Sequence, residues 1–268
     1  MRRMLAAVCC AATFVSCLFL SACFDEKATL AMSTEYDITG ISAIVLKYEG
    51  DNVSVTLAQD DMLLLDEYLS RHDSGMLASV SFEGDRMIIK GGERPSNGSM
   101  SAHVELQVPA YYKGSLVIST TSGQVNVLLD NDLERLSLQS LSGNLIVSGV
   151  SAHSIELFSR SGACRLSSTR MTGDISIGSD SGRLELALPK DQPMRLVACT
   201  VSGHLVIPYE QEPPTALSKE LVRDSMSTYA SLGHVVAESD FSTFESNQGM
   251  NPPGTIRLYT NSGRITVS

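Results

Sequence analysis

The sequence predicts an all-β protein: a parallel, right-handed β-solenoid with coils of about 20 residues and an inserted loop or cap segment. Two observations predict this fold. A Ser-Gly pair recurs every 19 to 21 residues from Ser122 to Ser202 and again at Ser262, and apolar residues alternate with polar ones on both sides of each of these pairs. A third observation, an apolar N-terminal stretch that ends in small residues before Cys23, predicts export and lipidation.

The first 22 residues are predicted to be a lipoprotein signal peptide. Arg2 and Arg3 form a basic start, and the apolar stretch from Leu5 to Leu20 is short for a bilayer-spanning helix. The stretch ends in Leu20-Ser21-Ala22-Cys23, which resembles the lipobox of bacterial lipoproteins. That resemblance implies cleavage before Cys23 and lipidation of its thiol. The alternative is an ordinary secretory signal cleaved nearby, with Cys23 unmodified.

Lipidation predicts a membrane partner, reached through the N-terminus. Two or three acyl chains hold a protein firmly, because each buried methylene contributes about 0.8 kcal/mol. Residues 23–38 would then be the tether between membrane and solenoid. We therefore expect an extracytoplasmic protein of the bacterial cell envelope, either periplasmic or surface-exposed.

The charge balance is acidic. The chain has 20 Lys and Arg residues against 30 Asp and Glu residues, a net charge of −10, which becomes −12 without Arg2 and Arg3. This balance argues against nucleic acid as a partner and against direct adhesion to anionic headgroups. The chain has no tryptophan, which is unusual for a surface that stacks on carbohydrate.

The repeat lies within residues 111–268. When the serine of each Ser-Gly pair is position zero, positions −6, −4, +3 and +5 are apolar in nearly every repeat, and position −2 is always Ser or Thr. Apolar residues at every second position have the period of a β-strand, so each coil is predicted to be strand, corner, strand. The six serines are Ser122, Ser142, Ser161, Ser181, Ser202 and Ser262.

The two constant corner positions have separate predicted roles. The glycine is expected to supply the left-handed or otherwise strained dihedral of a sharp bend. The hydroxyl at −2 points inward in this frame, and we expect a ladder of such side chains to satisfy backbone groups at the corners. A catalytic role for it would need a base that recurs in each coil, and none does.

The same frame predicts the state of the two cysteines beyond Cys23. Cys164 is at +3, an inward position, and Cys199 is at −3, an outward one. Side chains on opposite faces of a sheet lack the converging geometry of a disulfide. We therefore predict two free thiols.

Residues 39–110 carry a weaker form of the pattern and are predicted to be strand pairs that open the solenoid. One pair flanks Glu49-Gly50-Asp51 and another flanks Glu83-Gly84-Asp85. Between them, Met62–His72 has the pattern of a short helix, and Glu93–Met100, rich in Gly, Pro, Ser and Asn, that of a loop.

Residues 211–253 form the predicted insertion in the solenoid. Open solenoid ends expose strand edges that must be covered, so this segment is predicted to be either a cap or a lateral excursion that carries function. Its Tyr229, Phe241 and Phe244 are the candidate partner contacts.

Several stretches resemble a known family. The runs Val104–Pro109 and Leu116–Val125, together with the ending Gly254–Ile265, are similar to the bacterial putative-adhesin family, and the resemblance spans residues 38–268. It implies a β-helical fold at the cell surface or in the envelope. Where that family commonly has an acidic residue after Ser-Gly, this chain has others, so a cation-binding acidic stripe is not expected. Those residues are Gln124, Asn144, Ala163, Arg183, His204 and Arg264.

No catalytic, cofactor or metal site is predicted. The five histidines are scattered without metal-ligand spacing, and outward acids such as Glu156 and Glu185 are expected not to stack with partners, as the carboxylates of a polysaccharide-cleaving enzyme would. The leading hypothesis is a non-catalytic, adhesin-like envelope lipoprotein that presents a rigid surface to a protein or glycan. The alternatives are a structural or assembly component without a ligand site, and a polysaccharide-active enzyme.

Overall fold

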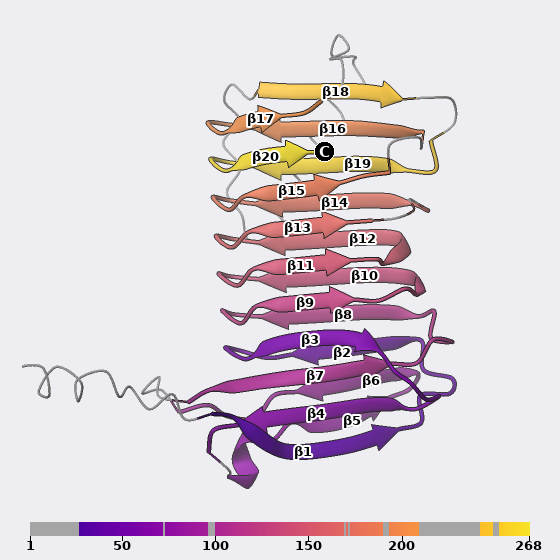
Figure 1. Cartoon of the computed structure of the whole chain (residues 1–268), viewed down its shortest axis with the longest axis vertical. Helices are drawn as coiled ribbons and strands as arrows, with labels where there is room; N and C mark the ends of the chain where they lie inside the picture. Colours follow the sequence, from indigo (N-terminus) through magenta and orange to yellow (C-terminus); the bar gives the residue numbers. More distant parts are fainter. Residues whose placement is uncertain are drawn as a thin grey trace, which may run out of the picture.

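The computed structural model describes residues 27–71, 73–95, 100–168, 170, 172–189, 193–208, 242–248 and 252–268. These residues form two ten-stranded sheets that face one another along an elongated stack, as Figure 1 shows. The structure is all-β and its sheets are mainly parallel, as the sequence predicts for a solenoid. Cys23 and the predicted signal peptide lie outside the described residues.

The strands of each sheet lie side by side in an order that differs from their order in the chain. From one edge to the other, sheet A contains β1 (Thr29–Tyr36), β4 (Leu63–Leu69), β7 (Ala102–Val108), β3 (Asn52–Leu57), β9 (Val125–Leu128), β11 (Leu145–Ser148), β13 (Cys164–Ser167), β15 (Leu184–Ala187), β20 (Arg264–Val267) and β17 (His204–Val206). Sheet B contains β18 (Ser242–Gln248), β16 (Met194–Thr200), β19 (Thr255–Thr260), β14 (Asp174–Ser179), β12 (Ser151–Ser159), β10 (Asp132–Ser140), β8 (Ser115–Thr120), β2 (Ala43–Lys47), β6 (Arg86–Lys90) and β5 (Ser79–Glu83).

From β8 to β15 the chain alternates between the sheets, passing from sheet B through a Ser-Gly corner to sheet A. Equivalent positions pair in register: Leu116 lies beside Leu136 in sheet B, and Val125 lies beside Leu145 in sheet A. The inward aliphatic side chains of both sheets are buried and form one continuous core. Stacking therefore gives each coil the dry interior that it could not enclose alone.

The last coil does not lie at the end of the stack. β19 and β20, which end the chain, lie between the β14–β15 coil and the β16–β17 coil, as Figure 1 shows. The N-terminal end of the stack shows a similar change of order, because the β6–β7 coil lies outside the β2–β3 coil, which precedes it in the chain. The order of the coils in space thus differs from their order in the chain at both ends.

Antiparallel strands border both ends of the stack. β4 and β1 extend sheet A beyond β7, and β5 extends sheet B beyond β6. At the other end β18 pairs with β16 along seven residues. β18 belongs to the predicted insertion, and it covers the exposed edge of sheet B as a cap would. Tyr229 and Phe241 lie outside the described residues.

The helix predicted over Met62–His72 is wrong. Leu63–Leu69 is strand β4, which pairs with β1 on one side and β7 on the other. Its inward side chains are Leu63, Leu65, Glu67 and Leu69, all buried. The polar residue at an inward position breaks the apolar alternation, and two antiparallel neighbours outweigh the local helical pattern.

Of the left-handed or otherwise strained dihedral predicted for the corner glycines, the left-handed alternative is wrong. Among the described residues, the glycines with positive φ are Gly40, Gly84 and Gly149, none of which follows a corner serine. The corner glycines are required for space. A Cβ on Gly162 would overlap the carbonyl oxygen of Gly143 in the coil beneath, and a Cβ on Gly143 would overlap that of Gly123. Close approach of successive corners, and not the bend itself, selects glycine.

The hydroxyl ladder is present at all six corners. In each coil the side chain at −2 accepts a hydrogen bond from the glycine N–H three residues later, for example Ser140 from Gly143 at 2.7 Å and Ser159 from Gly162 at 3.0 Å. Ser159 also donates to the carbonyl oxygen of Gly143, at 2.9 Å. Each such hydroxyl is buried. It therefore satisfies corner groups that the strands leave unpaired.

As predicted, Cys164 and Cys199 form no disulfide with each other. Cys164 lies in the core, and burial raises the pKa of its thiol to about 12. Cys199 lies on the outward side of β16, but it is buried as well, next to Tyr259 of β19. Within the described ranges no helical segment has the length and apolar character that crossing a membrane would require.

Candidate functional site

The first corner of the solenoid departs from the repeat. The pairing of Leu46 with Ile118 places Tyr48 beside Thr120, so a tyrosine occupies the position of the constant hydroxyl. At the same corner, Asp51 occupies the position of the constant glycine, directly beneath Gly123. These two exchanges introduce a phenol and a carboxylate at the place where the repeats end.

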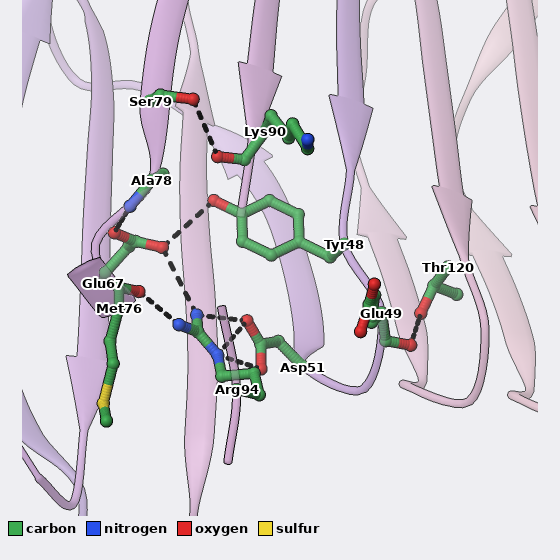
Figure 2. A network of polar contacts seen from close by, with 10 residues as sticks. All are labelled: Tyr48, Glu49, Asp51, Glu67, Met76, Ala78, Ser79, Lys90, Arg94 and Thr120. Atoms are coloured by element: carbon green, nitrogen blue, oxygen red, sulfur yellow. Dashed lines mark hydrogen bonds and ion pairs between the residues drawn. The ribbon is translucent and has the colours of Figure 1, made fainter. Parts of the chain in front are cut away.

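Arg94 joins Asp51 to Glu67 of strand β4, and Tyr48 bonds to Glu67 directly, as Figure 2 shows. Its guanidinium donates to Asp51 through Nε at 2.9 Å and through the terminal nitrogen at 2.5 Å, which makes a bidentate pair. The same nitrogen lies 3.8 Å from Oε1 of Glu67, and the other donates to the carbonyl oxygen of Met76. We call Tyr48, Asp51, Glu67 and Arg94 the Arg94 cluster.

Glu67 is the most deeply buried member, with 0% of its surface exposed. Oε1 accepts from the Tyr48 hydroxyl at 3.2 Å, and Oε2 accepts from the Ala78 N–H at 2.6 Å. Burial raises the pKa of Glu67, while the Ala78 N–H and Arg94 oppose that rise. Burial, together with the neighbouring Glu67 carboxylate, also raises the pKa of Tyr48.

Two glycines bring Arg94 into this position. A Cβ on Gly91 would overlap the Tyr48 ring, and one on Gly92 would overlap the carbonyl group of Met76. The chain therefore passes closely between the first corner and the short 3₁₀ turn η1 (Ser74–Met76), where the Glu93 N–H donates to Gly75. Residues 93–95 lie outside regular structure, as the loop prediction expects, and 96–99 lie outside the described residues.

The geometry gives the Arg94 cluster a structural role. Its acidic and phenolic groups are enclosed, and each has a hydrogen-bond partner within the protein. The cluster thus closes the first corner with a paired cation, at the positions where the other coils have a hydroxyl and a glycine. Sequence reasoning missed it, although Glu67 among alternating leucines, and Asp51 in a glycine position, were the signals that could have found it.

The outer faces contain a second set of polar contacts, which contradicts one expectation. Glu156 and Glu185 do have partners on neighbouring coils: Arg135 lies 2.6 Å from Glu156, and Arg165 lies 2.6 Å from Glu185. The hydrogen bond from Arg165 lowers the pKa of Glu185. Arg165 lies directly beside Glu185 in the strand pairing, and Arg135 is a diagonal neighbour of Glu156, so these carboxylates join coils and do not form an acidic pair.

The predicted contact residues do not form a described surface. Phe244 lies in β18, where its backbone pairs with Ala198 of β16, and Tyr229 and Phe241 fall outside the described residues. Of the histidines, His103 stacks on Tyr68 with ring centroids 4.3 Å apart. In the part of the chain that the structure describes, no group of three or more His, Cys, Asp or Glu side chains could hold a metal ion.

The repeats of this chain match a known family. A family model described as Toastrack DUF4097 matches residues 41–172 and again 115–227, which together exceed half of the chain. The chain belongs to the Toastrack DUF4097 family. No curated protein matches the sequence. The resemblance predicted from the sequence is thus confirmed at the level of this Toastrack family.

One solved structure shares the fold of this Toastrack chain. It is a "putative cell adhesion protein" from Clostridium sporogenes, with a TM-score of 0.54 and 11% identity, covering 90% of this chain and 99% of that one. A "putative adhesin" from Bacteroides fragilis is 14% identical, covers 90% and 97%, and has a TM-score of 0.33. At these identities the first likeness shows the fold alone.

Proposed function

We propose that this Toastrack protein is a non-catalytic lipoprotein of the bacterial cell envelope that presents the outer faces of its solenoid to a protein or glycan. The observation that supports this most directly is the form of the surface. Outward polar side chains stand in rows along a rigid stack, and ion pairs such as Arg135–Glu156 join one coil to the next. The buried titratable groups of the Arg94 cluster are paired with one another.

Three finer features complete the proposal. The coils wind right-handed with a period of about 20 residues, as parallel crossovers favour. Cys23 carries the lipid, and residues 23–38 connect it to the stack. The adhesive role draws support from the name of the Clostridium sporogenes structure, which shares the fold.

Anchoring is tested by the Cys23→Ser variant of the full-length protein. In cells, the wild-type protein is expected to have a lipid-modified N-terminal cysteine, whereas the variant is expected to keep the uncleaved N-terminal stretch and to have no lipid. Mass spectrometry of the N-terminal peptide identifies the modification. An unmodified Cys23 in the mature wild-type protein would contradict the lipoprotein proposal, because it would indicate ordinary secretory cleavage.

Binding is tested with arrays of envelope and matrix glycans and with protein pull-down. The full-length protein is compared with a variant in which residues 211–241 are replaced by a short Gly-Ser linker, so that β18 is kept. Loss of binding in the variant would place the contacts in the segment that includes Tyr229 and Phe241, while unchanged binding would place them on the coils. Absence of any ligand, with the protein protected from protease on intact cells, would favour a structural role instead.

A further inference from the structure

The column of residues that follows the Ser-Gly corners becomes basic at one end of the stack. In the strand register, Arg264 of β20 lies directly beside His204 of β17. Leu184 of β15 lies beside Ile265 of β20, which places Arg183 next to Arg264. Because the last coil is inserted before the β16–β17 coil, the two arginines are immediate neighbours and the histidine comes third. We call Arg183, Arg264 and His204 the basic ladder, whose rungs are about 4.8 Å apart.

The ladder faces solvent. The Arg183 side chain is 60% exposed, and Arg264 and His204 are exposed as well. The serines at the adjoining corners, Ser181, Ser262 and Ser202, are also exposed, so a row of hydroxyls runs alongside. The surface thus combines planar guanidinium donors with hydroxyl groups, which suits carboxylate, sulfate or phosphate groups.

Arg264 differs from most arginines of the coils in its ion pairing with the described residues. Five other arginines of the coils have a carboxylate within ion-pair distance: Arg135 has Glu156, Arg160 has Asp180, Arg165 has Glu185, Arg170 has Asp132, and Arg257 has Asp174. No carboxylate of the described residues lies within that distance of Arg264. Arg183 reaches Glu185 at 3.4 Å, but Arg165 already contacts this carboxylate at 2.6 Å.

This arrangement does not serve the stability of the fold. Like charges on directly neighbouring strands repel one another, whereas the pairs elsewhere on the coils alternate in sign. An anion from outside the protein would relieve that repulsion. The ladder is therefore best explained by a ligand that supplies negative charge along the stacking direction.

We propose that the basic ladder binds a linear anionic polysaccharide that runs along the solenoid axis. This inference rests on the proposed function. For the case in which the partner is a glycan, it names the chemical class of that glycan. A thin chain experiences the local field of the ladder within the Debye length of about 8 Å, whereas an anionic membrane plane would also meet the acidic remainder of the protein. Single-stranded nucleic acid would require aromatic platforms, and the ladder and its serines include none.

The test measures binding of the full-length protein to immobilised dextran sulfate and to neutral dextran. The double variant Arg183→Gln/Arg264→Gln is compared with Arg135→Gln/Arg170→Gln, which removes the same charge from elsewhere on the coils. We expect the wild-type protein to bind dextran sulfate and not neutral dextran. The affinity for dextran sulfate should fall about threefold for each ladder substitution and about tenfold for the ladder double variant, and should change less than about twofold for the control double variant. Raising the salt concentration should weaken wild-type binding.

Other outcomes would overturn the inference. An equal loss of affinity for dextran sulfate in both double variants would show that only the net charge of the protein matters. Binding to phosphatidylglycerol vesicles that depends on the ladder, without binding to dextran sulfate, would show that the ligand is a lipid surface and not a polysaccharide. If the arrays reveal a partner that both double variants bind normally, the ladder inference fails while the proposed function stands. If no partner is found by any of these assays, both fail.

Discussion

At the scale of single residues, the repeat is defined by steric and hydrogen-bonding constraints at the corners. The glycine keeps successive corners in contact, and the hydroxyl two residues before the serine accepts the N–H that the bend leaves unpaired. The sequence pattern identified both positions but gave the wrong reason for glycine. A repeated residue shows that a constraint exists, whereas the neighbouring coil that imposes it appears only in three dimensions.

Gly162→Ala should therefore destabilise the protein, by about 1–3 kcal/mol, because its Cβ would overlap the Gly143 carbonyl oxygen in a packed stack. Gly50→Ala is the matched control. Its Cβ would lie 3.5 Å from Oγ of Ser122, an ordinary contact, so a change within about 0.5 kcal/mol is expected. Urea denaturation followed by circular dichroism measures both, and similar values for the two variants would contradict the stacking explanation.

Glu67 and Glu185 should give opposite pH dependences of stability. The pKa of Glu67 is raised by burial, so the folded protein holds its proton above the ordinary value of 4.5, and stability contributed by this group falls as pH rises through its folded pKa. The pKa of Glu185 is lowered by Arg165, so its contribution is present above 4.5 and is lost as pH falls through its folded pKa.

The melting temperatures of the wild-type protein and of Glu67→Gln and Glu185→Gln, measured between pH 3 and 8, check this prediction. The wild-type advantage over Glu67→Gln should shrink as pH rises, and its advantage over Glu185→Gln should grow. Parallel curves for all three proteins would show that neither carboxylate has the protonation behaviour that its surroundings indicate.

At the scale of strands and coils, the alternation of apolar residues predicted most of the elements. It failed for β4, where Glu67 interrupts the inward leucines and the spacing of Met62, Leu65 and Leu69 imitates one face of a helix. It also gave no information on the order of the coils. Every coil offers the same aliphatic positions to its neighbours, so the repeat pattern cannot distinguish which coil follows which in space.

Removal of residues 254–268 tests the inserted coil. Without β19 and β20, the β16–β17 coil has lost its parallel neighbours, while β8 to β13 keep theirs. Hydrogen exchange followed by mass spectrometry should show loss of amide protection in residues 194–206 and retained protection in residues 115–167. Retained protection in 194–206 would mean that this coil stacks directly on β14–β15, in chain order.

For the whole molecule, the sequence predicted the solenoid but not the way in which its ends are closed. The repeats share one frame and can be aligned with one another, whereas the Arg94 cluster and the antiparallel strands at the ends are formed by segments that occur once. Several of the partners are distant in the chain, as with Arg94 and Asp51 or β16 and β18. The role of the candidate contact residues could not be predicted for the same reason. They lie outside the repeat, so the repeat pattern does not predict on which face of the molecule each aromatic side chain lies.

The closing strand β18 should keep the stack monomeric. β18 occupies the edge of β16 through antiparallel pairing, and a free edge of that length is a template for a second chain. Thr243→Pro/Phe244→Pro removes two consecutive N–H groups, one of which faces β16, whereas Thr243→Ala/Phe244→Ala keeps both. Sedimentation velocity over a range of concentrations should show association of the proline variant and a monomer for the alanine variant. If the proline variant stays monomeric with its strands intact, the edge of β16 is protected by something other than β18, and the capping role assigned to this strand is wrong.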